Sequence, residues 1–232
     1  MPQAKRKESR EAGGSPTTRA ILDAAHRLFL KAGYDAVNLE QIARGAGVSR
    51  QTVYNQFGSK EAVFHEVVKR HWGAVRNEAA SAFAAVESVA ASPAESLRNF
   101  ARALLRFVEE TDQVAFTRLV IAESRQRQWI SDEFYRCGKE PILKCFAAAL
   151  GAMAKHGMIT CAHPELAAHQ FMGLVQEFVI WPRVMAIGKG LADLPANDVV
   201  IEEAIAMFLS RYAPAGDSYP PPGLLSPRRC RC

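Results

Sequence analysis

The stretch LEQIARGAGVSRQTVYNQFGSK, residues 39–60, decides the fold of the N-terminal part of the chain. It predicts two short helices joined by a tight turn, with a third helix starting directly after them. Asn38 and Gln41 have the spacing of a capping box before the first helix. Gly47 suits the left-handed position that ends this helix, and Ser49 can cap the next one. The pattern is that of a helix-turn-helix, whose second helix fits a DNA major groove.

The second helix of this motif separates apolar from polar side chains. Val53 and Phe57 point to one side and suit a core, whereas the other side carries hydrogen-bond donors and acceptors. These outward residues are Arg50, Gln51, Thr52, Asn55 and Gln56. Arg can pair with guanine, and Asn or Gln with adenine, through bidentate hydrogen bonds, while Tyr54 and Lys60 suit phosphate contacts. The alternative is a solvated polar face on a small helical bundle.

The net charge of the chain is concentrated around this motif. The 232 residues include 29 Lys and Arg and 24 Asp and Glu, which gives a net charge of +5. Residues 1–60 hold ten of the basic and five of the acidic residues, so they carry the whole excess. A phosphate-binding surface needs this asymmetry and a generic helical bundle does not. The charge therefore favours double-stranded DNA as a partner over a helix-turn-helix that serves only packing.

Composition argues against several other classes of protein. No apolar run approaches the roughly 18 residues that a membrane span needs. Residues 1–14 are basic with no apolar segment after them, so we expect a flexible arm, or an undirected tail, rather than a secretory signal. The five cysteines are odd in number and include no C-x-x-C pair, which argues against a zinc site or a disulfide framework. They suit packing residues in a reducing cytosol, with a redox sensor as the alternative. We therefore expect a cytoplasmic protein without a metal or cofactor.

Helical periodicity continues beyond the motif, and no segment of useful length has the period of a strand. We expect a first helix after Ser15 that ends at Gly33, and a long helix capped by Ser59 that runs toward residue 87. Pro182 should kink or shorten the fourth of the helices that follow. Those further helices are expected at about 93–110, 113–126, 130–156, 164–187 and 197–212.

The fold is therefore predicted to be all-α, with the helix-turn-helix in a small N-terminal unit. The expected parts are a basic arm at 1–14, a three-helix DNA-binding domain at 15–60, a helical regulatory and dimerisation domain at 61–213, and a disordered Pro-rich tail at 214–232. An enzyme is the rival class, but neither H-E-x-x-H nor G-x-S-x-G occurs. We expect no catalytic site.

The N-terminal pattern resembles the DNA-binding domain of TetR/AcrR-type transcriptional regulators. The similarity covers residues 17–64 almost continuously and rests on A-x-x-L-F-x-x-x-G-Y, I-A-x-x-A-G-V-S, T-V-Y-x-x-F and S-K-E. The segments EFYRCGKEPILKCF and PELAAHQFMGLVQEFVI resemble the AefR-like subgroup. The resemblance implies a homodimeric, ligand-responsive repressor that places one recognition helix in each major groove of a palindromic operator.

Carried across by position, the resemblance assigns DNA contacts to individual residues. The residues that would face bases are Arg50, Gln51, Thr52 and Asn55, and those that would bind phosphates are Tyr54, Lys60, Arg44 and Thr18. The chain departs from the common pattern where Gln51 replaces a frequent Gly, Asn55-Gln56 a frequent aromatic or His pair, and Gly58 a frequent Pro. These changes are compatible with the fold, but they prevent a prediction of the operator sequence from the resemblance.

The C-terminal helices are rich in aromatic residues, most of which a bundle of this size needs for its core. The resemblance adds an expected pocket for a small, largely apolar effector. Its candidate lining residues are Phe107, Phe116, Val120, Glu123, Trp129, Phe146 and Phe171. Apolar stripes on the last two helices can form a four-helix dimer interface, or else intramolecular core. The candidate interface residues are Leu174, Val175, Phe178, Ile201, Ile205 and Phe208.

Overall fold

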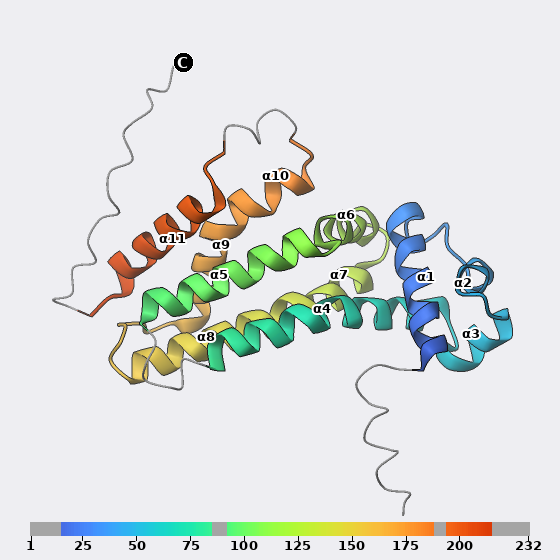
Figure 1. Ribbon diagram of the computed structural model, residues 1–232, viewed down its shortest axis with the longest axis horizontal. Helices are drawn as coiled ribbons and strands as arrows, with labels where there is room; N and C mark the ends of the chain where they lie inside the picture. The colour runs from blue at the N-terminus through green and yellow to red at the C-terminus, as the bar shows by residue number, and fades with distance from the viewer. Residues whose placement is uncertain (1–14, 85–91, 188–193, 215–232) are drawn as a thin grey trace, which may run out of the picture. The chain divides into compact units, whose positions relative to one another are not determined.

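The computed structural model describes residues 15–84, 92–187 and 194–214, which form helices and the turns between them, without a strand (Figure 1). The all-α prediction is confirmed. The expected basic arm at 1–14, the end of the long helix near residue 87 and nearly all of the Pro-rich tail lie outside the described residues. No helix among those that the structure describes is both long and apolar enough to cross a membrane.

The chain divides into two compact units that are not continuous in sequence. The first combines residues 1–74 with 115–138, and the second combines residues 75–114 with 139–232. Residues 115–138 thus pack with the helix-turn-helix part of the chain, although the sequence analysis assigned them to the regulatory domain. Each unit is described by itself below.

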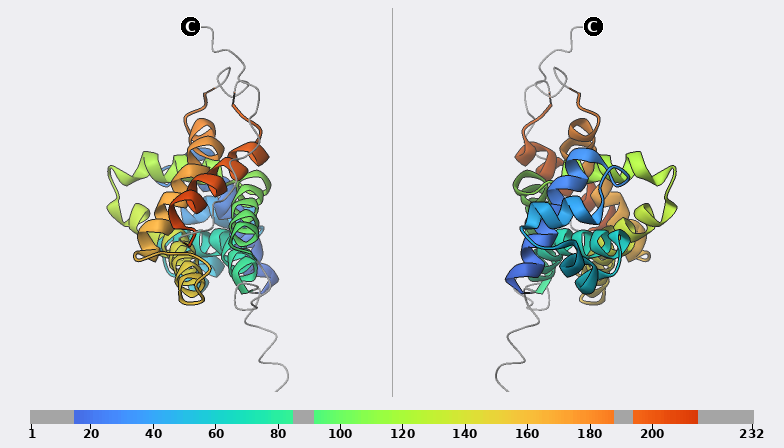
Figure 2. Two further views of the ribbon diagram at one scale, coloured as in Figure 1. Left: turned by 90° about the vertical axis from the view of Figure 1, so that its left-hand side faces the viewer. Right: turned by 90° about the vertical axis from the view of Figure 1, so that its right-hand side faces the viewer.

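The first unit contains the predicted three helices, the first part of the long helix that follows them, and two helices from much later in the chain. Its elements are α1 (Pro16–Ala32), α2 (Leu39–Ala46), α3 (Arg50–Phe57), the first part of α4 (Lys60–Ala84), α6 (Gln113–Ser124) and α7 (Gln128–Phe134). Helix α2 packs against both α1 and α3, and the three lie together in the right-hand view of Figure 2. Phe29 and Phe64 form the centre of its core, with their rings 5.1 Å apart and both side chains fully buried.

Local signals fix the ends of these helices as the sequence predicted. The Ser15 hydroxyl accepts a hydrogen bond from the Thr18 amide at the start of α1. Asn38 and Gln41 form a reciprocal capping box at the start of α2. Gly47 ends α2 with φ of 68°, a left-handed conformation that a side chain would disfavour. The angle between α2 and α3 is therefore set by a turn that these few residues encode.

The predicted single helix at 130–156 is wrong. The structure has α7, then one π-helical turn at Tyr135–Lys139, then α8 (Glu140–Lys155). Pro141 has no amide hydrogen to donate four residues back, and its ring would clash there, so a regular α-helix cannot continue through this point. Gly138 lies inside the π-helical turn against Trp72, and a Cβ at this position would come within 2.1 Å of the indole ring.

The second unit is a helical bundle. Its elements include α5 (Pro93–Glu110), α8, α9 (Pro164–Val179), α10 (Trp181–Val184) and α11 (Asn197–Tyr212), with α9 at its centre. Helix α9 packs against α5, α8, α10 and α11. The helix expected at 164–187 is divided between α9 and α10, with Pro182 in α10, so the expected shortening is confirmed. Phe100, Phe146 and Phe171 form the centre of the core, and all three side chains are fully buried.

Candidate nucleic-acid interface

Helix α3 presents one polar, exposed face and buries the opposite one. Val53 is completely buried, whereas Arg50, Gln51 and Asn55 are exposed and Tyr54 is 55% exposed. The Ser49 hydroxyl accepts a hydrogen bond from the Thr52 amide and so caps the helix. The eight residues of α3 are therefore held by their first turn and their apolar side, and the polar side is open to a partner.

Two of the exposed side chains on α3 form a pair. Gln51 Nε2 donates a hydrogen bond to Asn55 Oδ1 at 2.7 Å, one helical turn apart. An amide has two donor hydrogens and two acceptor lone pairs, so both side chains keep free groups for base edges. The third amide of this face, Gln56, accepts a hydrogen bond from the Thr18 hydroxyl of α1 at 3.4 Å. Arg44, the last basic residue of α2, is exposed.

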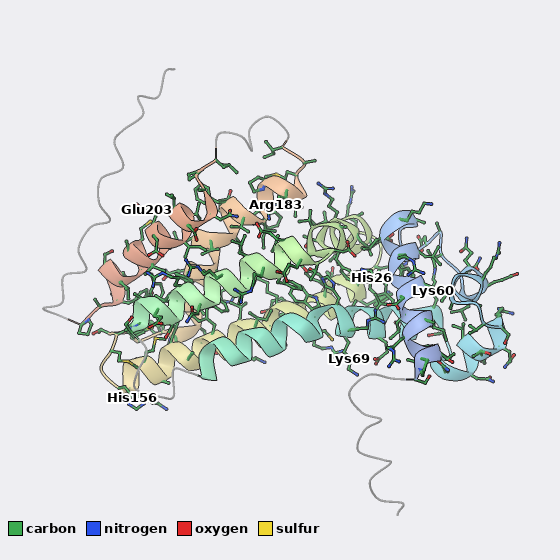
Figure 3. The ribbon with its side chains drawn as sticks, viewed as in Figure 1. His26, Lys60, Lys69, His156, Arg183 and Glu203 are labelled. Atoms are coloured by element: carbon green, nitrogen blue, oxygen red, sulfur yellow. The ribbon has the colours of Figure 1, made fainter. Side chains whose placement is uncertain are left out.

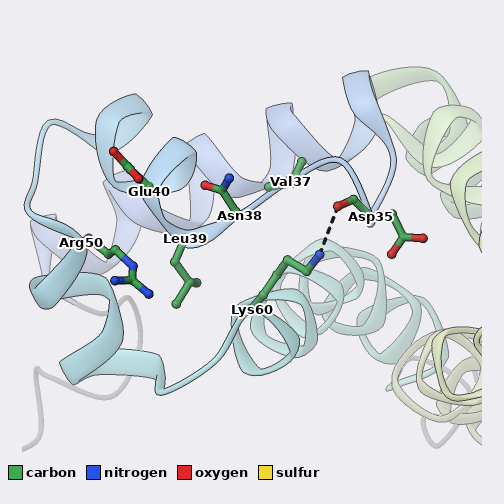
Figure 4. A pocket seen from close by; sticks show the side chains of 7 residues that line it. All are labelled: Asp35, Val37, Asn38, Leu39, Glu40, Arg50 and Lys60. Carbon is green, nitrogen blue, oxygen red and sulfur yellow. Dashed lines mark hydrogen bonds between the residues drawn. The ribbon is translucent and has the colours of Figure 1, made fainter.

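Lys60, a predicted phosphate contact, has a partner inside the protein. Its ammonium group donates a hydrogen bond to the Tyr34 carbonyl at 2.9 Å and lies 4.2 Å from the centre of the Tyr34 ring. Figure 3 labels it at the start of α4, and Figure 4 shows it beside a hollow that Asp35 and Arg50 also line. Burial lowers the pKa of Lys60 below its usual range.

The connection between α1 and α2 is held by side chains from α6 and from the turn after it. Glu123 Oε1 accepts a hydrogen bond from the Tyr34 amide at 2.8 Å, and Arg127 binds the Asp35 carboxylate at 2.6 Å. Trp129 packs edge to face on the Tyr34 ring, with ring centres 5.3 Å apart. Sequence reasoning missed the contact between Glu123 and Tyr34, because 89 residues separate the two and no local pattern connects them.

A second acidic residue of the first unit is buried among polar partners. Glu133 is 6% exposed and accepts hydrogen bonds from Arg136 and from the Cys137 thiol, while His65 Nδ1 lies 3.0 Å from Oε1. Burial alone would raise the pKa of Glu133, but the hydrogen bonds from these three side chains lower it below its usual range. Burial and the bond to Glu133 raise the pKa of Cys137 to about 11. This thiol is therefore protonated at neutral pH, which argues against a reactive redox cysteine here.

The predicted effector-binding residues are divided between the two units. Phe116, Val120, Glu123 and Trp129 belong to the first unit, and Phe107, Phe146 and Phe171 belong to the second. Phe116 is fully buried and stacks on His71 with ring centres 4.6 Å apart. Phe146 lies 4.1 Å from Phe100, measured between ring centres. These contacts place Phe116 and Phe146 in the cores of their own units.

The predicted dimer stripe falls mostly inside the second unit. Val175, Ile201, Ile205 and Phe208 are each at most 3% exposed within the single chain, and Leu174 is half-buried. Of the predicted interface residues, Phe178 is the exposed one, at 41%. Other apolar side chains of α9, α10 and α11 are exposed and were not predicted: Leu166, Trp181 and Met207. Glu203, four residues before Met207, is exposed on α11 (Figure 3).

Family models match both parts of the chain. Residues 21–67 match the model for bacterial regulatory proteins of the tetR family, and residues 95–214 match the C-terminal domain of AefR-like transcriptional repressors. The second match alone spans more than half of the chain. Among the described residues, no group of three His, Cys, Asp or Glu side chains is placed to hold a metal ion.

Curated relatives match parts of the chain. The HTH-type transcriptional regulator BetI of Rhizobium meliloti (strain 1021) is 36% identical over 106 residues, which is 45% of this chain and 48% of BetI. AlkX of Mycobacterium tuberculosis (strain ATCC 25618 / H37Rv) is 42% identical over 53 residues, which is 23% of this chain and 25% of AlkX. The chain therefore spans less than half the length of these relatives.

Solved structures match over nearly the full length. A TetR-family transcriptional regulator from Mesorhizobium loti MAFF303099 has a TM-score of 0.73 and 26% identity, with 85% of this chain and 96% of that chain covered. The flavonoid-responsive regulator FrrA has a TM-score of 0.68 and 29% identity, with 86% and 98% covered. With the capped helix-turn-helix and the two family matches, these findings confirm the resemblance: the chain belongs to the TetR family of transcriptional regulators, which is a family of DNA-binding proteins and not of enzymes.

Proposed function

We propose that this regulator is a repressor that binds a pseudo-palindromic operator as a homodimer through α3. The observation that carries the proposal is the exposed face of α3, where Arg50, Gln51 and Asn55 present free hydrogen-bonding groups. Arg suits guanine, and the two amides suit adenine. Tyr54, Arg44 and Thr18 remain proposed phosphate contacts. The positive excess of residues 1–60 supplies attraction to any duplex.

The dimer is proposed to form through the outer sides of α9 and α11. Two recognition helices must lie about 34–36 Å apart, one turn of DNA, or a multiple of this distance. A two-fold body with a firm interface is therefore needed. The exposed side chains of Leu166, Phe178 and Met207 give these helices an apolar surface that a second copy can cover.

The effector is proposed to be a small, largely apolar molecule bound by the C-terminal helices. The relative FrrA is described as flavonoid-responsive, which supports an effector of this general kind. A ligand shifts an equilibrium only if it prefers one state. A preference of about 100-fold, near 2.7 kcal/mol, would weaken operator binding usefully. We propose that a shift of α4 carries the change to the recognition helices.

The test is a DNA-binding titration of the purified full-length protein. Labelled fragments from the DNA upstream of its own gene would be compared with random duplexes of equal length over a series of salt concentrations. We expect tight, salt-sensitive binding to one upstream fragment. Equal affinity for upstream and random DNA at every salt concentration would refute the proposal. A thermal-shift screen of hydrophobic compounds, followed by operator release with each hit, tests the effector separately.

A further inference from the structure

We infer that Glu123 is a positioning residue for DNA binding, although it lies 89 residues beyond the loop that it holds. It forms its described side-chain hydrogen bonds with Tyr34 and Arg127, which lie outside α3. It fixes the peptide of Tyr34, in the connection that sets where α2 begins, and α2 in turn packs against α3. The inference rests on the proposed function in one respect, that α3 is the helix that reads DNA.

Both backbone polar groups of Tyr34 are bound by side chains from other helices. Glu123 of α6 accepts from its amide at 2.8 Å, and Lys60 of α4 donates to its carbonyl at 2.9 Å. Tyr34 is 7% exposed, and its ring stacks on Phe29. Burial, followed in size by the Glu61 charge, raises the pKa of the Tyr34 hydroxyl to about 12. Tyr34 is therefore held at its amide, its carbonyl and its ring.

The local position of Glu123 is unfavourable unless these contacts exist. It is the last but one residue of α6, where the negative end of the helix dipole disfavours a carboxylate. Its side chain is only 14% exposed, so water compensates the charge poorly. Arg127 supplies an opposite charge at 3.5 Å and also binds Asp35. The negative charge of Glu123 is thus compensated by the hydrogen bond from the Tyr34 amide and by the Arg127 guanidinium.

The neighbouring glycine fits the same contact. Gly33 has φ of 81°, and a Cβ at this position would lie 2.9 Å from Glu123 Oε1. A side chain at position 33 would therefore be strained in its backbone and would also displace the carboxylate. Glu123 was a candidate polar contact for an effector in the sequence analysis. Its geometry instead gives it a role in the DNA-binding unit, because the carboxylate is already bonded on both sides.

The test compares three variants of the full-length protein. Glu123→Ala removes the acceptor, and Glu123→Gln keeps an oxygen for the Tyr34 amide while removing the charge. Arg125→Ala is the control, since Arg125 is an exposed charged residue of the same turn. We measure hydrogen exchange of the amides at residues 33–57, and affinity for operator and random DNA.

We expect Glu123→Ala to exchange the Tyr34 amide about tenfold faster and to bind operator about tenfold more weakly, from the loss of one charge-assisted hydrogen bond. Random-DNA affinity should change less than about twofold, because phosphate contacts dominate it. Glu123→Gln should largely restore both properties, and Arg125→Ala should match the wild type.

Two outcomes would overturn the inference. Unchanged exchange at Tyr34 in Glu123→Ala would show that the bond does not hold the loop. Faster exchange with unchanged operator affinity would show that the loop does not position α3. If the wild type fails to distinguish operator from random DNA, the proposed function fails instead. Exchange at Tyr34 and along α2 and α3 would then still decide whether Glu123 positions these helices.

Discussion

Helices α3 and α11 both separate polar from apolar side chains, but the separation means something different in each. In α3, the polar side chains predicted to face outward are exposed or partly exposed. In α11, the apolar stripe that suited a dimer interface is the core of its own unit, and Met207 lies outside it. A polarity pattern therefore tells which side of a helix is covered. It does not tell whether the cover comes from the same chain or from another.

The largest expected effect separates two adjacent residues of α11. Phe208 is 3% exposed and Met207 is 57% exposed. We expect Phe208→Glu to lose at least about 4 kcal/mol of stability, because an unpaired charge replaces a packed ring. Met207→Glu should stay folded and become monomeric, since its side chain faces the proposed partner. Urea denaturation followed by circular dichroism, with sedimentation velocity, measures both effects. A folded, monomeric Phe208→Glu variant would reverse this assignment of the two faces.

The next effect concerns the amide pair on α3. Gln51→Ala and Asn55→Ala should each remove about 1–3 kcal/mol of discrimination between operator and a base-substituted site. Because Gln51 donates to Asn55 at 2.7 Å, the double variant should lose less than the sum of the single variants. Fluorescence anisotropy with the four proteins completes the cycle, and random DNA serves as the control. Additive losses would mean that the two amides read the bases independently.

A smaller effect is expected at Lys60, which begins α4 directly after the recognition helix. Lys60→Met should lower the free energy of unfolding by about 1 kcal/mol, through loss of the bond to the Tyr34 carbonyl. An ammonium group has three donor hydrogens, so a phosphate can still be bound in the complex. The slope of log affinity against log salt should then fall by about one unit. Lost stability with an unchanged slope would leave Lys60 with a role inside the protein alone.

The smallest expected effect is a dependence of the free energy of unfolding on pH, to which one carboxylate in each unit contributes. Hydrogen bonds lower the folded-state pKa of Glu133, against the effect of its burial, and Arg98 lowers that of Glu202. A lowered carboxyl pKa gives stability that is present above the unfolded pKa and is lost as the pH falls through the folded value. Glu133→Gln should therefore reduce the loss of stability that the wild type shows as the pH falls from about 6 to about 3. Glu202→Gln should change it less, because solvent screens a side chain that is 41% exposed.

The pH dependence of these variants is measured by urea denaturation at each pH. Lys144→Ala is a suitable control for a surface ion pair, since Lys144 is 70% exposed in its bond to Glu140. If the stability of Glu133→Gln fell with pH as steeply as that of the wild type, Glu133 would be shown not to titrate in this range.

Most of the fold could be predicted from the sequence because its signals are local. The caps at Ser15, Asn38 and Ser49 act within three residues, and the bounds of α5 and α11 agree with the expected 93–110 and 197–212. The π-helical turn before Pro141 was missed because helical periodicity continues across it.

The site could be predicted only in part, because some of its contacts are not local in the sequence. The polar face of α3 follows from helical spacing within one segment. The contact of Glu123 with Tyr34 depends on packing between segments that lie far apart in the sequence. The aromatic candidates for a pocket share the composition of a core, so composition alone cannot separate the two uses.

The discontinuous first unit has a consequence for synthesis of the chain. Residues 1–74 leave the ribosome well before residues 115–138, which complete the same unit. During that interval Phe64 lacks Trp129, and the Tyr34 amide lacks its carboxylate. Contacts between segments this far apart form late, because the intervening chain must first be ordered. A fragment that stops at residue 74 would therefore contain the whole helix-turn-helix and still be an unfinished folding unit.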